Sequence, residues 1–125
     1  KIAPGHGTRH IIAYCGAVAP EAALAAAKTG AALLAITSAD RLHQQWTALG
    51  ARSHINRLLS VLPHQTKIVS VLDGHPATLS CLGGVNGQAI RPLGVQSYGQ
   101  SADIPDLYRI HRIDAAAIEQ AIAED

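Results

Sequence analysis

HIIAYCGAVAPEAALAAAKTGAALLAITS, residues 10–38, carries the strongest structural signal in this chain. It begins with a short β-branched and apolar run, His10–Gly16, which predicts a buried strand closed by glycine. An alanine-rich segment follows, in which Pro20 suits the first helical turn and Gly30 suits the C-cap. The run Ala31–Ser38 predicts a second buried strand. Strand, helix and strand in this order predict a βαβ unit with parallel pairing and a right-handed crossover.

Helical patterns follow the second strand. The segment Thr37–Asp40 has the form of a capping box and predicts a helix that ends near Gly50. The stretch SHINRLLSVLP carries apolar residues at three- and four-residue spacing up to Pro63, so it predicts another helix. We predict a further helix over Pro76–Gly83, ended by the glycine pair at 83 and 84.

Two more strand patterns complete the sheet. KIVSVL (Lys67–Leu72) predicts a third strand and QAIRPLG a fourth, in which Pro92 indicates an edge strand or an irregular end. The alternation predicts an α/β fold: a three-layer α/β/α sandwich around a mostly parallel sheet of four to five strands. Only four strands are evident, whereas sheets commonly have about five or more, so we expect a missing strand upstream of Lys1.

Two helix caps are expected near the carboxyl end of the chain. Ser101 or Asp103 is expected to cap a helix that starts near Pro105. Asp114 is expected to cap the last helix, whose inner face carries Ile118.

Composition limits the class of protein. The 125 residues suit a single domain, residues 1–125. A net charge of +1 gives no electrostatic footprint for nucleic acid or an anionic membrane. No apolar run is long enough to span a bilayer, and no signal peptide is evident, so we expect a cytoplasmic protein. Because the sequence contains no methionine, we expect a piece of a longer polypeptide.

The ends of the predicted strands hold the candidate site residues, because open parallel sheets bind ligands and partners there. They include the turn Asp73-Gly74-His75 and the long polar loop Gly94–Ser101. His75 is a candidate proton relay, but we favour a turn-stabilising Asp73 with a solvent-facing His75. GQSAD starts like a nucleophile elbow, but Asp103 replaces its second glycine, so a capping role is expected for Ser101.

The spacing of glycine, cysteine and histidine residues does not support phosphate-binding, thiol or metal chemistry. No phosphate-binding glycine motif is present. Cys15 and Cys81 are expected to be small, buried and reduced. The histidines do not cluster with cysteines or carboxylates as metal ligands do. We therefore predict no catalytic, cofactor-binding or metal-binding residue.

Three stretches together resemble one protein family. They are CGAVAPEAAL (residues 15–24), TSADRLHQQW (residues 37–46) and VLDGHPATLSCLGGVNGQAIRPLGVQSYGQSADIPDLYRIHRIDAAAI (residues 71–118). They resemble the carboxyl-terminal domain of transketolase-like, thiamine diphosphate-dependent enzymes. The closest match is the single-chain, homodimeric E1 component of pyruvate dehydrogenase complexes, of bacterial type. Tyr98 stands where many members have Phe.

The resemblance implies that this chain is the C-terminal, dimer-supporting domain of a larger enzyme. In that family, thiamine diphosphate and Mg²⁺ lie between the first two domains, so no catalytic residue is carried onto this chain. E1 enzymes decarboxylate a 2-oxo acid oxidatively and pass the acyl group to the lipoyl arm of an E2 acyltransferase. The residues expected to contact sister domains or the second subunit are Asp73, His75, Gln96, Tyr98 and Ser101.

Two alternatives stay open. The chain is also compatible with the same domain of a transketolase, because this domain does not touch substrate. From a different class, a stand-alone flavodoxin-like module for ligand binding or regulation requires a concave apolar pocket at the strand ends.

Overall fold

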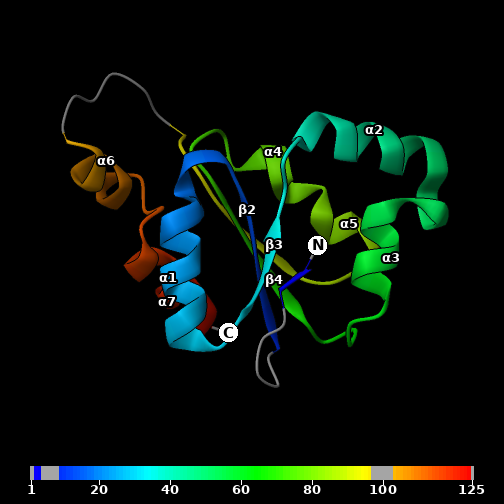
Figure 1. The fold of residues 1–125 in the computed structure, drawn as a ribbon, viewed down its shortest axis with the longest axis horizontal. Coiled ribbons are helices and arrows are strands. Elements are labelled where there is room, and N and C mark those ends of the chain that lie inside the picture. Colours follow the sequence, from blue (N-terminus) through cyan, green and yellow to red (C-terminus); the bar gives the residue numbers. More distant parts are fainter. Residues whose placement is uncertain (1, 4–8, 97–102, 125) are drawn as a thin grey trace.

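The computed structural model describes residues 2–3, 9–96 and 103–124. Within these ranges the chain forms a five-stranded sheet in the order β1-β3-β2-β4-β5, with helices on both faces (Figure 1). The strands are β1 (Ile2–Ala3), β2 (His10–Cys15), β3 (Ala32–Ala35), β4 (Lys67–Leu72) and β5 (Ile90–Leu93). All neighbouring pairs are parallel except β1 and β3. The predicted mostly parallel α/β/α sandwich is confirmed.

The helices divide between the two faces of the sheet (Figure 1). One face is covered by α1 (Ala19–Thr29), α6 (Ile104–Ile110) and α7 (Ala115–Ala123), and a 3₁₀ turn, Gly16–Val18, leads into α1. The other face is covered by α2 (Ala39–Leu49), α3 (His54–Ser60), α4 (Ala77–Ser80) and α5 (Leu82–Val85). None of the helices in the described part of the chain is long and apolar enough to cross a lipid bilayer.

The two central strands supply side chains to both cores. In register, Ile11 of β2 lies opposite Ile68 of β4 and joins the core under α3, α4 and α5. Ile12 lies opposite Val69 and joins the core under α1 and α7. Because successive residues of a strand point to opposite faces, a strand covered on both sides needs an apolar run without alternation. The uninterrupted apolar run in β2 therefore predicts a strand that lies inside the sheet.

Most of the predicted element boundaries are confirmed. β4 spans the predicted residues, and β5, which contains Pro92, is an edge strand. The N-cap of α2 is Ser38, whose side chain accepts from the N–H of Arg41 at 3.3 Å. Asp103 is the N-cap residue of α6, although its side chain makes no capping hydrogen bond.

Two expectations about elements differ from the structure. The pair Gly83-Gly84 lies inside α5 and does not end a helix; the helical segment instead breaks at Cys81, between α4 and α5. A Cβ added at Gly83 would lie 2.7 Å from Cγ2 of Ile90, so glycine serves a close approach of helix to strand there. The fifth strand, expected upstream of Lys1, is Ile2–Ala3, which is too short to show a periodic pattern.

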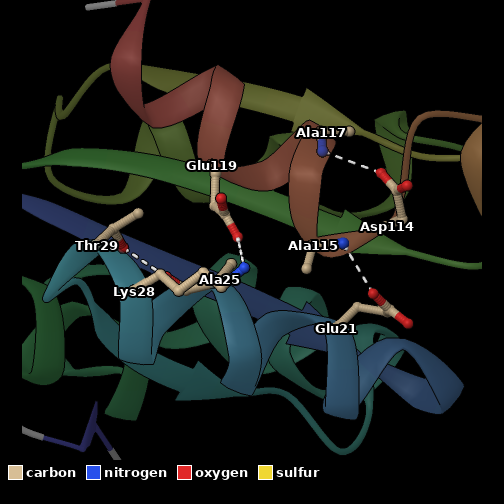
Figure 2. Close-up of polar contacts among 8 residues, drawn as sticks. All are labelled: Glu21, Ala25, Lys28, Thr29, Asp114, Ala115, Ala117 and Glu119. Atoms are coloured by element: carbon tan, nitrogen blue, oxygen red, sulfur yellow. Dashed lines mark hydrogen bonds and ion pairs between the residues drawn. The ribbon is translucent and has the colours of Figure 1, made fainter.

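The interface between α1 and α7 joins distant parts of the chain. Figure 2 shows Glu21 of α1 reaching the first turn of α7, where its Oε2 accepts from the N–H of Ala115 at 2.8 Å. The N-cap residue Asp114 accepts from the N–H of Ala117 at 3.0 Å. Two carboxylates thus satisfy two N–H groups that have no partner within the helix. Glu21 and Ala115 are 94 positions apart, so no local sequence pattern predicts this contact.

We expect Glu21→Ala to lower the free energy of unfolding by about 1–2 kcal/mol, because it leaves the Ala115 N–H without its partner. Lys28→Ala is the matched control, since the exposed Lys28 side chain joins the same two helices through a long ion pair, 3.8 Å, to the half-buried Glu119. Its loss should cost less than about 0.5 kcal/mol. Urea denaturation measures both, and equal costs would contradict the assigned role of Glu21.

Candidate functional site

The candidate site lies where β2 and β4 end side by side. Cys15 is paired with Leu72 at the carboxyl ends of these strands. From this point the chain continues from β2 toward β3 on one side and from β4 toward β5 on the other. Such a reversal of strand order is the usual place for a ligand or partner in an open parallel sheet.

Gly16 and Asp73 meet at this point. Gly16 has φ +82°, a left-handed conformation that favours glycine. A Cβ added there would lie 3.1 Å from Oδ1 of Asp73, so the exposed Asp73 side chain lies directly against the backbone of Gly16. The first residues after β2 and β4 are therefore packed against each other.

The negative charge of Asp73 contributes to raised pKa values of two nearby groups, Cys15 and Tyr108. Burial raises the pKa of the half-buried Cys15 thiol, and the negative charge of Asp73 raises it further. Burial also raises the pKa of the Tyr108 phenol on α6, and the charges of Asp73 and Glu21 add to this effect. Both groups are therefore held in the protonated form, which makes Cys15 a poor nucleophile and Tyr108 a hydrogen-bond donor.

The turn after β4 is fixed by several contacts. Nδ1 of the exposed His75 accepts from the N–H of Ala77 at 3.1 Å, at the start of α4. The carbonyl oxygen of Gly74 accepts from the N–H of Val95 at 2.7 Å. A Cβ added at Gly94 would lie 2.7 Å from the nitrogen of Pro76, so two backbone segments touch here. His75 is exposed, as we favoured, but its own side chain bonds the backbone of the turn, a role that we expected of Asp73.

The structure brings three of the five predicted contact residues to one edge. Asp73 and His75 share the turn after β4, and Gln96 follows the Gly94 contact with that turn; all three are exposed. Tyr98 and Ser101 lie outside the described residues, as does the capping role expected for Ser101. That these side chains contact another domain stays a prediction.

The remaining thiol and His43 lie on other elements. Cys81 is half-buried between α4 and α5, and burial raises the pKa of its thiol, which a hydrogen bond from the backbone partly offsets. Both cysteines are free, but neither is fully buried as predicted. His43 packs edge-on against Trp46, with ring centroids 6.2 Å apart. Within residues 2–3, 9–96 and 103–124, no group of three or more His, Cys, Asp or Glu side chains is placed to hold a metal ion.

In comparisons with known proteins, no family model and no curated protein matches the chain. The resemblance to the transketolase-like carboxyl-terminal domain therefore rests on its sequence motifs alone.

We expect Gly16→Ala to lower the free energy of unfolding by about 2 kcal/mol, from left-handed strain plus the clash with Asp73. Gly30→Ala is the control, because Gly30 has φ +76° but nothing within 4 Å of an added Cβ. Strain alone should cost about 1 kcal/mol there.

The double variant Gly16→Ala, Asp73→Ala separates the two causes. With the carboxylate removed, the cost of Gly16→Ala should fall to that of Gly30→Ala. Urea denaturation of Gly16→Ala, Gly30→Ala, Asp73→Ala, the double variant and the parent chain gives the comparison. Equal costs of the two glycine substitutions in the parent chain would refute the contact between Gly16 and Asp73.

Proposed function

We propose that this chain is the C-terminal, dimer-supporting domain of a transketolase-like, thiamine diphosphate-dependent enzyme of the pyruvate dehydrogenase E1 type. The observation that carries the proposal is the run of motifs from Pro92 to Ile118. The parent enzyme would decarboxylate a 2-oxo acid and transfer the acyl group to a lipoyl arm. Its partners would be sister domains, a second subunit and an E2 acyltransferase.

Two motif residues have structural roles that explain their place in the run. Gly94, from Pro-Leu-Gly-Val, lets the chain after β5 touch the backbone of the turn after β4. Asp114, from Ile-Asp-Ala, caps α7. Both residues fix the backbone of the domain, as expected for motifs that specify a supporting domain and not a reaction.

The turn after β4 packs closely against the residues that follow β2 and β5. Asp73 lies against Gly16, and the Gly74 carbonyl is bonded to the N–H of Val95. An added Cβ at Gly94 would lie 2.5 Å from the Gly74 oxygen, so a diphosphate has no room to enter between these segments. The family resemblance assigns the cofactor contacts to the first two domains of the parent enzyme, and close packing at this turn is compatible with that assignment.

Helix α6 is the surface that we assign to contacts with neighbouring domains. It carries two exposed large apolar side chains, Ile104 (65% exposed) and Ile110 (48%). Tyr108 on the same helix packs on the core beside α1 and α7 and responds to the charge of Asp73. Exposed apolar side chains next to the predicted contact edge are typical of a surface that another domain covers.

A domain-replacement experiment tests the proposal. The chain is fused after the first two domains of a homodimeric pyruvate dehydrogenase E1 that lacks its own third domain and, in parallel, after those of a transketolase. We expect the E1 fusion to regain dimerisation and lipoyl-dependent acyl transfer. Restoration of the transketolase alone would favour the transketolase alternative, and restoration of neither would contradict the proposal.

Substitutions on α6 show whether restoration depends on this surface. Ile104→Ser with Ile110→Ser should leave the thermal unfolding of the isolated chain nearly unchanged, because both side chains are exposed. It should lower restored activity at least about tenfold, since each apolar side chain buried at an interface contributes about 1.5–3 kcal/mol. Val61→Ser is the control, because Val61 is 81% exposed at the end of α3, on the other face. Equal effects of the two changes would contradict the assignment.

One observation favours the stand-alone ligand-binding alternative. A pocket of about 410 Å³ lies at the carboxyl end of β3, between α2 and α3, with Ile36, Leu42 and Leu58 among its lining residues. Its size is within the range of small-molecule sites. A chain that restored neither enzyme but bound FMN at this pocket would establish that alternative instead.

A further inference from the structure

A second hollow lies between the edge strand β5 and helix α7. Its volume is about 290 Å³. Ala117 and Ala121 of α7, whose short side chains leave the space open, line one side. Arg91 of β5 lines the opposite side, and the groove is completed by His111 and Arg112 from the turn between α6 and α7. Three basic side chains from two separate segments thus border one small hollow.

A row of hydrogen bonds and ion pairs holds these side chains in place. Nη2 of Arg112 donates to Oε1 of Gln120 at 3.0 Å, and Nε2 of Gln120 donates to Oε1 of Glu124 at 3.1 Å. Oε2 of Glu124 in turn pairs with Nη2 of Arg91 at 2.6 Å. Two guanidinium charges face one carboxylate in this row, so the row has a net positive charge.

The backbone at Arg112 supports a specific role for its side chain. Arg112 has φ +59° and is the only non-glycine residue with positive φ among the described residues. A residue other than glycine in this conformation is uncommon and costs about 1–2 kcal/mol. The strained turn directs the chain from α6 into α7 and sets Arg112 beside Gln120, a neutral partner that leaves the guanidinium charge uncompensated within this contact.

We propose that this groove binds the phosphate group of a small phosphorylated compound, with Arg112 as the principal ligand and Arg91 as the second. The guanidinium fork matches phosphate oxygens with paired hydrogen bonds. Donors on β5 and on the turn between α6 and α7 approach from different sides, which suits a tetrahedral anion better than a planar carboxylate. The volume admits a phosphate and a few further atoms, near the lower limit for small-molecule sites. The proposal does not depend on the parent enzyme being an E1.

Titration of the 125-residue chain with inorganic phosphate, followed by ¹H–¹⁵N NMR at constant ionic strength, tests the site. We expect saturable shifts of the Ala117, Ala121 and Arg112 amides, with a dissociation constant of about 1–10 mM, because only a few charge-assisted hydrogen bonds form. Acetate should bind at least about fivefold more weakly, given its planar shape. Shifts without saturation, or equal binding of acetate, would overturn the proposal.

Three variants test which side chains contribute to phosphate binding. Arg112→Gln should weaken phosphate binding about tenfold, and Arg57→Gln, which removes the same charge from an exposed position on α3, should leave it unchanged. Glu124→Gln should strengthen binding about threefold, because it removes the carboxylate that competes for Arg91. Unchanged affinity in Arg112→Gln, or weaker binding in Glu124→Gln, would contradict the assigned roles.

Discussion

The arrangement of this domain depends on the packing of Asp73 against Gly16. This contact joins the first residues beyond the two central strands and requires a glycine with left-handed φ at the start of the turn into α1. The direction of α1 then places Glu21 at the first turn of α7, which it caps. Asp73 thus connects the sheet to the start of α1, and Glu21 connects α1 to α7. Each is a local contact, but together they fix the layer formed by α1 and α7.

The same contacts hold together the loops at the carboxyl edge of the sheet. The turn after β4 is bonded to Val95 and capped by His75, while Cys15 and Tyr108 are held protonated by burial and by the Asp73 charge. Predicted contact residues and the exposed apolar side chains of α6 border this edge. Such an edge suits the proposed supporting role, because contact residues on well-packed elements are positioned more precisely than residues on loops. The proposed phosphate groove adjoins this edge at Gly94 and Gln96 and extends along β5, where the facing helix carries alanines.

Sequence patterns predicted those features that depend on local periodicity. The apolar run of β2, the Gly30 cap of α1 and Pro92 in an edge strand all have signals within a few residues. Contacts between distant residues left no such signal: Glu21 and Ala115 are 94 positions apart. The glycine pair at 83 and 84 predicts a helix end because glycine destabilises helices, but the structural reason for Gly83 is its contact with Ile90 on β5. The candidate edge was predictable because strand ends in parallel sheets share a side, whereas the groove depends on side chains that only packing brings together.

The most direct test of a supporting role is calorimetric titration of the isolated chain with thiamine diphosphate, with and without Mg²⁺. The Arg112→Gln variant is titrated in parallel, so that binding of the diphosphate in the proposed groove is recognised separately. We predict no Mg²⁺-dependent binding tighter than about 1 mM in either protein. Micromolar binding that requires Mg²⁺ and persists in Arg112→Gln would show that this domain holds the cofactor by itself, which contradicts a purely supporting role.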